Sequence, residues 1–208
     1  MEVVQATTAV LGWGEIVKIV LASGVVAAFI GVAKDWFFRS REQKQEARFA
    51  AIGLVAKLDL YVLHSRRNLW LYRDAVDQLI PERDYQGWPV CSYPDLDISG
   101  DSLKHIGVEH ASSLAWISTE KALASQHLSA IEDSSFSPID VHGHKAEIVG
   151  YFGYEAYLLA KKMREEFTLP PFGERWGVDD KFSDLAHAWH RTKRVVAKRA
   201  QPITADDL

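Results

Sequence analysis

Apolar residues recur along this chain at the spacing of an α-helix, and no stretch of useful length alternates apolar and polar residues as a strand does. Before the first proline, apolar positions follow one another at steps of four and three residues, which places them on one face of a helix. This seam consists of Ala51, Val55, Leu58, Val62, Ser65, Leu69, Tyr72, Val76 and Leu79. Because such a seam packs against other helices, we predict a long helix in a bundle.

Proline positions mark where helices cannot continue, because proline removes a helical hydrogen bond and clashes with the preceding turn. The seven prolines leave four long stretches, 1–80, 95–137, 139–169 and 172–201. We predict one helix in each stretch, with linkers at 81–100, 133–142 and 168–178. The predicted fold class is all-α, and an up-down four-helix bundle is the economical arrangement.

The three later stretches carry the same helical periodicity. Their predicted core positions are His110, Leu114, Ile117, Lys121, Ala124, Leu128 and Ile131, then Val149, Phe152, Ala156, Leu159 and Met163, then Val178, Phe182, Leu185, Trp189, Thr192 and Val196. We expect His110 and Lys121 to lie at the margin of the core with their polar tips in water.

The N-terminal part of the first stretch has the features of a transmembrane helix. Fifteen uncharged residues lie between Lys18 and Lys34 and cover roughly 22 Å, which is short of the roughly 30 Å of a bilayer core. With the flanks 16–38 the helix reaches roughly 34 Å, provided both lysines extend toward the headgroups. Trp13 and Trp36 lie at its ends, where aromatic belts form. The alternative is a buried helix of a soluble protein.

The charges beside this segment predict its orientation. Basic residues crowd its C-terminal side, at Arg39, Arg41, Lys44 and Arg48, whereas Lys18 is alone on the other side. By the positive-inside tendency we expect a single-pass protein of the cell inner membrane, with the N-terminus outside and the bulk of the chain cytoplasmic. The predicted organisation is a short N-terminal segment (1–14), a transmembrane helix (15–38), a cytoplasmic helical bundle (39–201) and a flexible tail (202–208).

Small residues recur on one side of the predicted span. They are Ser23, Gly24, Ala27, Ala28 and Gly31. Such a face lets two helix backbones approach closely in lipid, where the hydrophobic effect does not drive helices together. We therefore predict that this face mediates a homo-oligomer.

The last helix ends in a basic cluster. In an up-down bundle this end returns toward the membrane and approaches the basic residues that follow the span. The predicted membrane-interface residues are Trp13, Lys18, Lys34, Trp36, Arg39, Arg41, Lys44, Arg48, Lys193, Arg194, Lys198 and Arg199. The alternative for the last four is an ordinary solvated helix end.

Two predicted linkers combine aromatic and acidic residues, which is a partner-binding composition. The candidate partner-binding residues are Trp88, Tyr93, Asp95, Asp97 and Trp176. The alternative is that the aromatic rings fold inward and cap the bundle.

Composition and motifs argue against several other functions. A formal net charge of −4 gives no reason to expect a nucleic-acid partner. Cys91 is the only cysteine and has no nearby histidine to act as a base. Asp184, His187 and His190 share one helical face, but that face points away from the predicted core, so we expect no metal there. No catalytic or cofactor motif is present.

The sequence therefore predicts a membrane-anchored helical protein that acts by protein interaction, as an adaptor, scaffold or sensor, and is not an enzyme. No cofactor is expected, and the partners are membrane lipid, further copies of the chain and an unidentified protein. The alternative is a small oligomeric pore or membrane-perturbing effector, which is similar in layout to membrane-anchored accessory proteins of bacterial defence systems.

Overall fold

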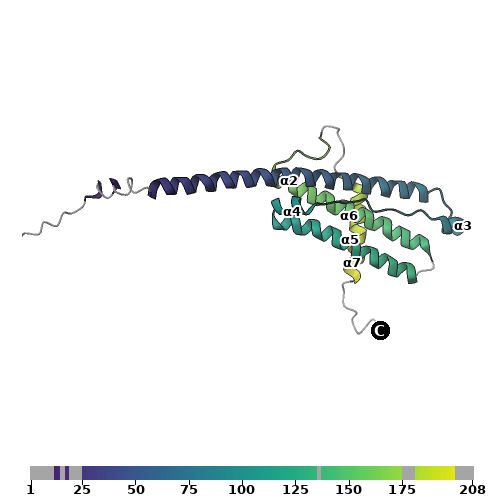
Figure 1. Cartoon of the computed structure of the whole chain (residues 1–208). Helices are drawn as coiled ribbons and strands as arrows, with labels where there is room; N and C mark the ends of the chain where they lie inside the picture. The colour runs from purple at the N-terminus through teal and green to yellow at the C-terminus, as the bar shows by residue number, and fades with distance from the viewer. Residues whose placement is uncertain (1–11, 15–16, 19–24, 135–136, 175–180, 200–208) are drawn as a thin grey trace, which may run out of the picture. The chain divides into compact units, whose positions relative to one another are not determined.

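The computed structural model describes residues 12–14, 17–18, 25–134, 137–174 and 181–199 (Figure 1). The chain divides into two compact units, Met1–Glu46 and Ala47–Leu208. All regular structure within the described ranges is helical, so the all-α fold class is confirmed. The helices are α2 (Val25–Val76), α3 (Pro81–Asp84), the 3₁₀ turn η1 (Tyr85–Gly87), α4 (Gly100–His105), α5 (Val108–Ser134), α6 (Pro138–Phe167) and α7 (Ser183–Arg199).

In the first unit, α2 carries a band of exposed apolar side chains. Between residues 28 and 39 every described residue is exposed, and the large apolar ones are 55–76% exposed. These are Phe29, Ile30, Val32, Trp36, Phe37 and Phe38. No helix in the described ranges is long and apolar enough to cross a membrane, and residues 15–16 and 19–24 of the predicted span lie outside those ranges. The predicted transmembrane helix is therefore not confirmed.

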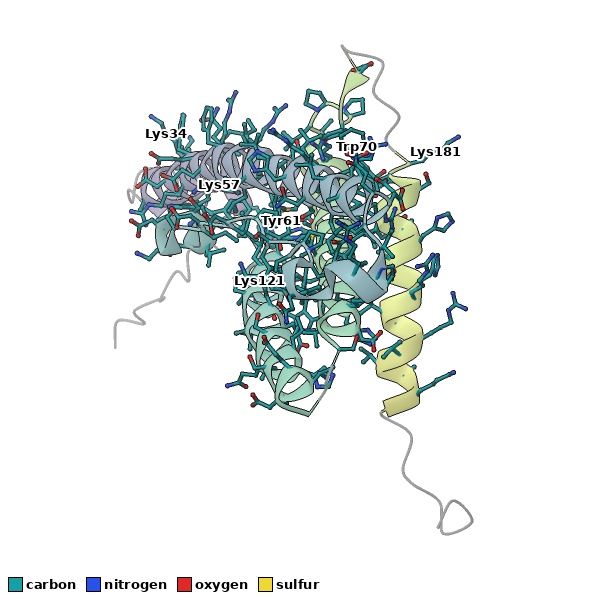
Figure 2. The ribbon with its side chains drawn as sticks, turned by 90° about the vertical axis from the view of Figure 1, so that its right-hand side faces the viewer. Lys34, Lys57, Tyr61, Trp70, Lys121 and Lys181 are labelled. Carbon is teal, nitrogen blue, oxygen red and sulfur yellow. The ribbon has the colours of Figure 1, made fainter. Side chains whose placement is uncertain are left out.

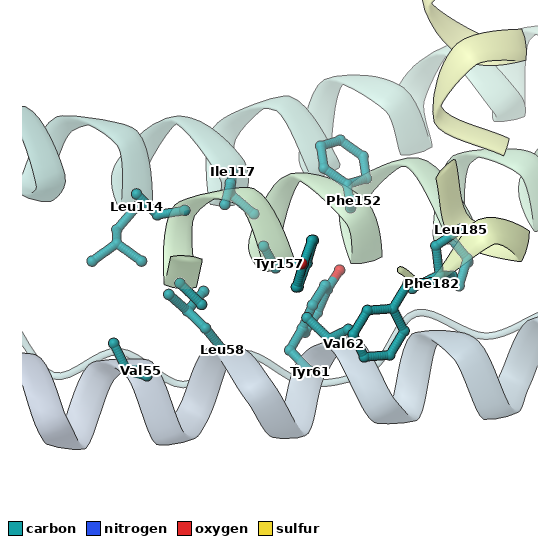
Figure 3. Close-up of a cluster of buried hydrophobic side chains, with 14 of the residues drawn as sticks. Val55, Leu58, Tyr61, Val62, Leu114, Ile117, Phe152, Tyr157, Phe182 and Leu185 are labelled. Atoms are coloured by element: carbon teal, nitrogen blue, oxygen red, sulfur yellow. The ribbon is translucent and has the colours of Figure 1, made fainter. Parts of the chain in front are cut away.

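In the second unit, α2, α5, α6 and the start of α7 enclose one apolar core (Figure 3). The predicted seam is confirmed from Ala51 to Leu69, where its members are at most 6% exposed. Further along, Tyr72 and Val76 are half-buried, and Leu79 lies beyond the end of α2. Figure 3 shows Leu58 and Tyr61 of α2 facing Leu114 of α5 and Tyr157 of α6. Burying one large apolar side chain contributes about 1.5–3 kcal/mol, so this seam is a major source of stability.

Helix α7 begins beside α2 and extends away from it at a steep angle (Figure 1, Figure 2). The predicted up-down four-helix bundle is therefore not confirmed. Phe182 lies immediately before α7, is buried and has a φ of 42°. Arg66 packs over its ring at 5.5 Å and donates from Nε to Asp184 Oδ2 at 3.1 Å. These contacts fix the direction in which α7 leaves the core.

Helix α6 begins earlier than the sequence predicted. Its first residue is Pro138, inside the predicted linker 133–142, and proline suits the first turn because the amide hydrogen it lacks has no helical acceptor there. His142 and His144 therefore lie on a helix. At the other end Thr168 adopts the left-handed conformation with φ of 52° and closes α6 by a backbone hydrogen bond to Arg164.

Two glycines let α6 approach its neighbours closely. A Cβ atom at Gly150 would lie 2.5 Å from the Cβ of Ala188 on α7, and one at Gly153 would lie 2.6 Å from the Cβ of Ser65 on α2. Real Cβ atoms do not come this close, so both positions require glycine. Gly53 on the outer side of α2 has nothing within 4 Å of its Cβ position.

The same substitution at these glycines should change stability in opposite directions. Gly150→Ala overpacks the contact with α7 and is expected to lower the free energy of unfolding by about 1–3 kcal/mol. Gly53→Ala meets no neighbour and restricts the unfolded chain, so it is expected to raise that free energy by about 0.5–1 kcal/mol. Denaturant unfolding of the purified full chain, followed by circular dichroism, measures both. Equal changes in the two variants would refute the close approach.

Candidate functional site

A groove of about 830 Å³ lies between α5, α6 and α7 of the second unit. Its floor is the first half of α6, with Ile139, Gly143 and Ile148. The apolar side chains of its walls are Trp116, Leu123, Leu128 and Ile131 of α5 and Val195 and Val196 of α7. The C-terminal end of α2 and Trp88 close one side. An apolar cleft of this size with a few polar groups is typical of a binding site.

The groove exists because α7 packs closely on α6 along only part of its length. Ala188 lies against Gly150, and four residues further along α7 the hydroxyl of Thr192 donates to the carbonyl oxygen of Glu147 at 3.5 Å. Beyond it Val196 is 56% exposed. The prediction that Val196 lies in the core seam is therefore wrong, and its side chain forms part of the groove.

Charged groups of both signs line the groove, with acids in excess. Glu120, Asp140 and Glu147 supply carboxylates, and Arg191 supplies the guanidinium. Arg191 donates to Glu147 Oε1 at 2.7 Å. No ion pair of Glu120 or Asp140 occurs among those found in the described part of the chain. The groove thus presents apolar surface beside two carboxylates that have no ion-pair partner in the described part of the chain.

Tyr151 lies in the groove beside these acids. Burial raises its pKa above the ordinary value for tyrosine, and the charge and hydrogen bond of Glu155 and the charge of Glu120 raise it further. Its hydroxyl therefore stays protonated at physiological pH and donates a hydrogen bond. A hydrogen-bond donor beside apolar surface suits binding.

The predicted partner-binding residues do not gather in one place. Trp88 is buried and donates from Nε1 to the hydroxyl of Tyr72 at 3.3 Å. Among the described candidate partner-binding residues, it alone lines the groove. Tyr93 packs against the core between the ammonium groups of Lys121 and Lys145. Asp95 and Asp97 are exposed, and Trp176 lies outside the described residues. Their role in partner binding stays a prediction.

The predicted membrane-interface residues are exposed wherever their side chains are described. In the first unit these are Trp13, Lys18, Lys34, Trp36, Arg39, Arg41 and Lys44, and in the second Arg48, Lys193, Arg194 and Lys198. Arg48 also donates to the carbonyl oxygen of Thr168 at 3.4 Å, and Lys193 lies 3.9 Å from the ring of Trp189. The structure does not describe the side chain of Arg199. Their contact with a membrane stays a prediction.

The predicted association face is described only in part. Ala28 and Gly31 are exposed, and nothing lies within 4 Å of a Cβ at Gly31. Ser23, Gly24 and the side chain of Ala27 lie outside the described residues. Self-association through this face is therefore untested.

Two ionisable pairs in the second unit are structural. His110 is 2% exposed, so the expectation that its tip reaches water is wrong; its Nε2 instead bonds Glu166 at 2.7 Å. Asp59 pairs with Arg164, which also donates to the carbonyl oxygen of Pro170. Burial raises the pKa of Asp59 and outweighs the opposing effect of the Arg164 bond and charge. Neither pair lines the groove.

Comparisons of the chain with protein-family models, with curated proteins and with solved structures found no match. No group of three or more residues suited to hold a metal ion occurs in the described ranges. The groove is therefore the candidate site on geometry alone. The groove could not be predicted from the sequence, because periodicity identifies the faces of helices and not where one helix leaves another.

Cys91 is buried, so we expect its thiol to react slowly in the folded protein. Burial raises the pKa of its thiol to about 11, against smaller opposing effects of the charges of Lys145 and Arg73. The thiolate is the reactive form, so at pH 8 we expect labelling by a disulfide reagent to be at least ~100-fold slower than for a free cysteine. Denaturant should restore the full rate. Rapid labelling of the folded full chain would contradict the buried position.

Proposed function

We propose that this chain is a single-pass membrane protein whose helical domain acts by binding a protein partner, as an adaptor, scaffold or sensor, without catalysis. The observation that carries the membrane anchor is the exposed apolar band of the first unit. At 100° per residue, Phe29, Ile30, Val32 and Phe38 point to different sides of α2. A helix that is apolar all round is stable inside lipid or inside a protein core, and these side chains have no such core around them.

The flanking charges support an orientation for this anchor. Exposed Arg39, Arg41 and Lys44 follow the band, and each basic group beside an anionic leaflet contributes about 1 kcal/mol. We therefore place the N-terminus outside and the helical domain in the cytoplasm, at the inner membrane. The groove between α5, α6 and α7 is the proposed partner site because it combines apolar surface with oriented polar groups.

Alkaline carbonate extraction tests the anchor. The full chain should remain in the membrane pellet. Phe29→Lys places a charge near the middle of the predicted span, which costs about 2.5–3.5 kcal/mol. The equilibrium constant for insertion should therefore fall on the order of a hundredfold, and the extracted fraction should rise. Leu60→Lys, at an exposed apolar position of the second unit, is the matched control and should leave retention unchanged. Complete extraction of the unmodified chain would refute the anchor.

Self-association through the small-residue face is a separate proposal. Replacing Ala27 and Gly31 by leucine blocks close approach of two helices, so the oligomer seen by native mass measurement in detergent should shift to monomer. Leucine at Val32 and Ala33 is the control, because those positions lie beside this face. An unchanged mass in the first variant would contradict the proposal.

The alternative function is a small oligomeric pore or membrane-perturbing effector of a bacterial defence-type system. The open space around Gly31 on an exposed helix favours close helix packing of the kind a pore needs. Ion leakage from vesicles that contain the full chain distinguishes the two functions. Leakage that the Ala27 and Gly31 replacements abolish would support the pore, and intact vesicles would support the adaptor.

A further inference from the structure

Building on the proposed function, we propose that the groove binds one amphipathic α-helix of a protein partner, and that this helix carries a lysine or arginine on the face that enters the groove. Two properties of the site support this partner, namely its elongated shape and its unbalanced charge.

The shape favours a helix over a compact small molecule. Groove residues extend along α5 from Trp116 to Ile131 and along α6 from Ile139 to Phe152, which corresponds to about 20 Å on each helix. Two helices form the walls of the groove and a third forms its floor, as in a bundle from which one helix is missing. A segment of three to four turns matches about 20 Å and presents apolar residues at the spacing such grooves receive.

The floor of the groove has room for close approach. A Cβ at Gly143 would contact only the hydroxyl oxygen of Tyr72, at 3.9 Å. A helix that enters the groove can therefore bring its side chains against the backbone of α6 at this point. A large residue at 143 would extend from that Cβ position and occupy part of the same space.

The charges indicate which helix fits. Arg191 engages Glu147, whereas Glu120 and Asp140 make no ion pair among those found in the described ranges. An apolar helix would bury these carboxylates without a counter-charge, and an acidic one would add repulsion. A basic side chain at the edge of the entering face pairs with them. The acidic charge of the groove also disfavours binding of the chain's own C-terminal residues 200–208, which contain Asp206 and Asp207 and no basic residue.

Two synthetic peptides test the proposal. Both are fluorescein-labelled 14-residue helices with the same leucine-rich face, and they differ in one position beside that face, which is lysine in one and glutamate in the other. Binding to the full chain in zwitterionic nanodiscs is measured by fluorescence anisotropy, with empty nanodiscs subtracted. We expect the lysine peptide to bind at least ~10-fold more tightly than the glutamate peptide.

Three variants locate the binding. Gly143→Leu fills the floor and should weaken the lysine peptide at least ~10-fold. Glu120→Lys reverses one of the two unpaired charges, so the site no longer has an excess of acid and the preference for the lysine peptide should be lost. Glu165→Lys changes the net charge equally, at an exposed acid outside the groove, and should change neither affinity by more than about twofold. Protection of the Cys91 thiol shows that each variant remains folded.

Equal binding of the two peptides, or binding that Gly143→Leu and Glu120→Lys leave unchanged, would overturn the inference. A concentration-dependent dimer that Gly143→Leu abolishes would assign the groove to a second copy of the chain and would also overturn it. The anchor and the groove partner are tested separately. If alkali extracts the chain but the chain still binds the lysine peptide more tightly than the glutamate peptide, only the anchor is refuted. If the chain stays in the membrane but does not discriminate the two peptides, only the groove inference is refuted.

Discussion

The second unit depends on the close approach of α6 to α2 and α7. Gly150 and Gly153 lie one turn apart, so the surface of α6 is flat where Ala188 and Ser65 meet it. Small residues on both sides of each contact bring the helix axes together and allow larger side chains beside them to interlock. Leu185, which is buried, packs beside both glycines. The approach therefore determines where α7 crosses and, through that crossing, where the groove opens.

Ion pairs at the edge of this core connect α2 to its two neighbours, α6 and α7. Arg66 connects α2 to Asp184 at the start of α7, and Arg164 connects α6 to Asp59 of α2. Both guanidinium groups also lie over phenylalanine rings, at 5.5 Å from Phe182 and Phe172. A planar guanidinium group can form an ion pair with a carboxylate and stack on an aromatic ring at the same time. Each of these arginines therefore orients the loop that carries its phenylalanine.

The sequence predicted the helices and the buried faces well, because both follow from local spacing. The seam from Ala51 to Leu69 is confirmed, since a strict four-three pattern has one low-energy packing solution. The position of the groove was not predictable, because it depends on the angle of α7, which arises from the glycine contacts and from the unusual backbone of Phe182. His110 was misjudged for a similar reason: its partner Glu166 is 56 residues away.

Exposed apolar residues have different consequences in the two units. Around α2 of the first unit they occur on all sides, and no single protein surface satisfies such a helix as completely as lipid does. In the groove they occur on facing walls beside carboxylates, which suits one partner element of defined charge. If both proposals hold, the anchor confines the groove and any partner of the same membrane to a thin layer. Such confinement raises the effective concentration toward the millimolar range, so a weak and reversible helix contact suffices for function.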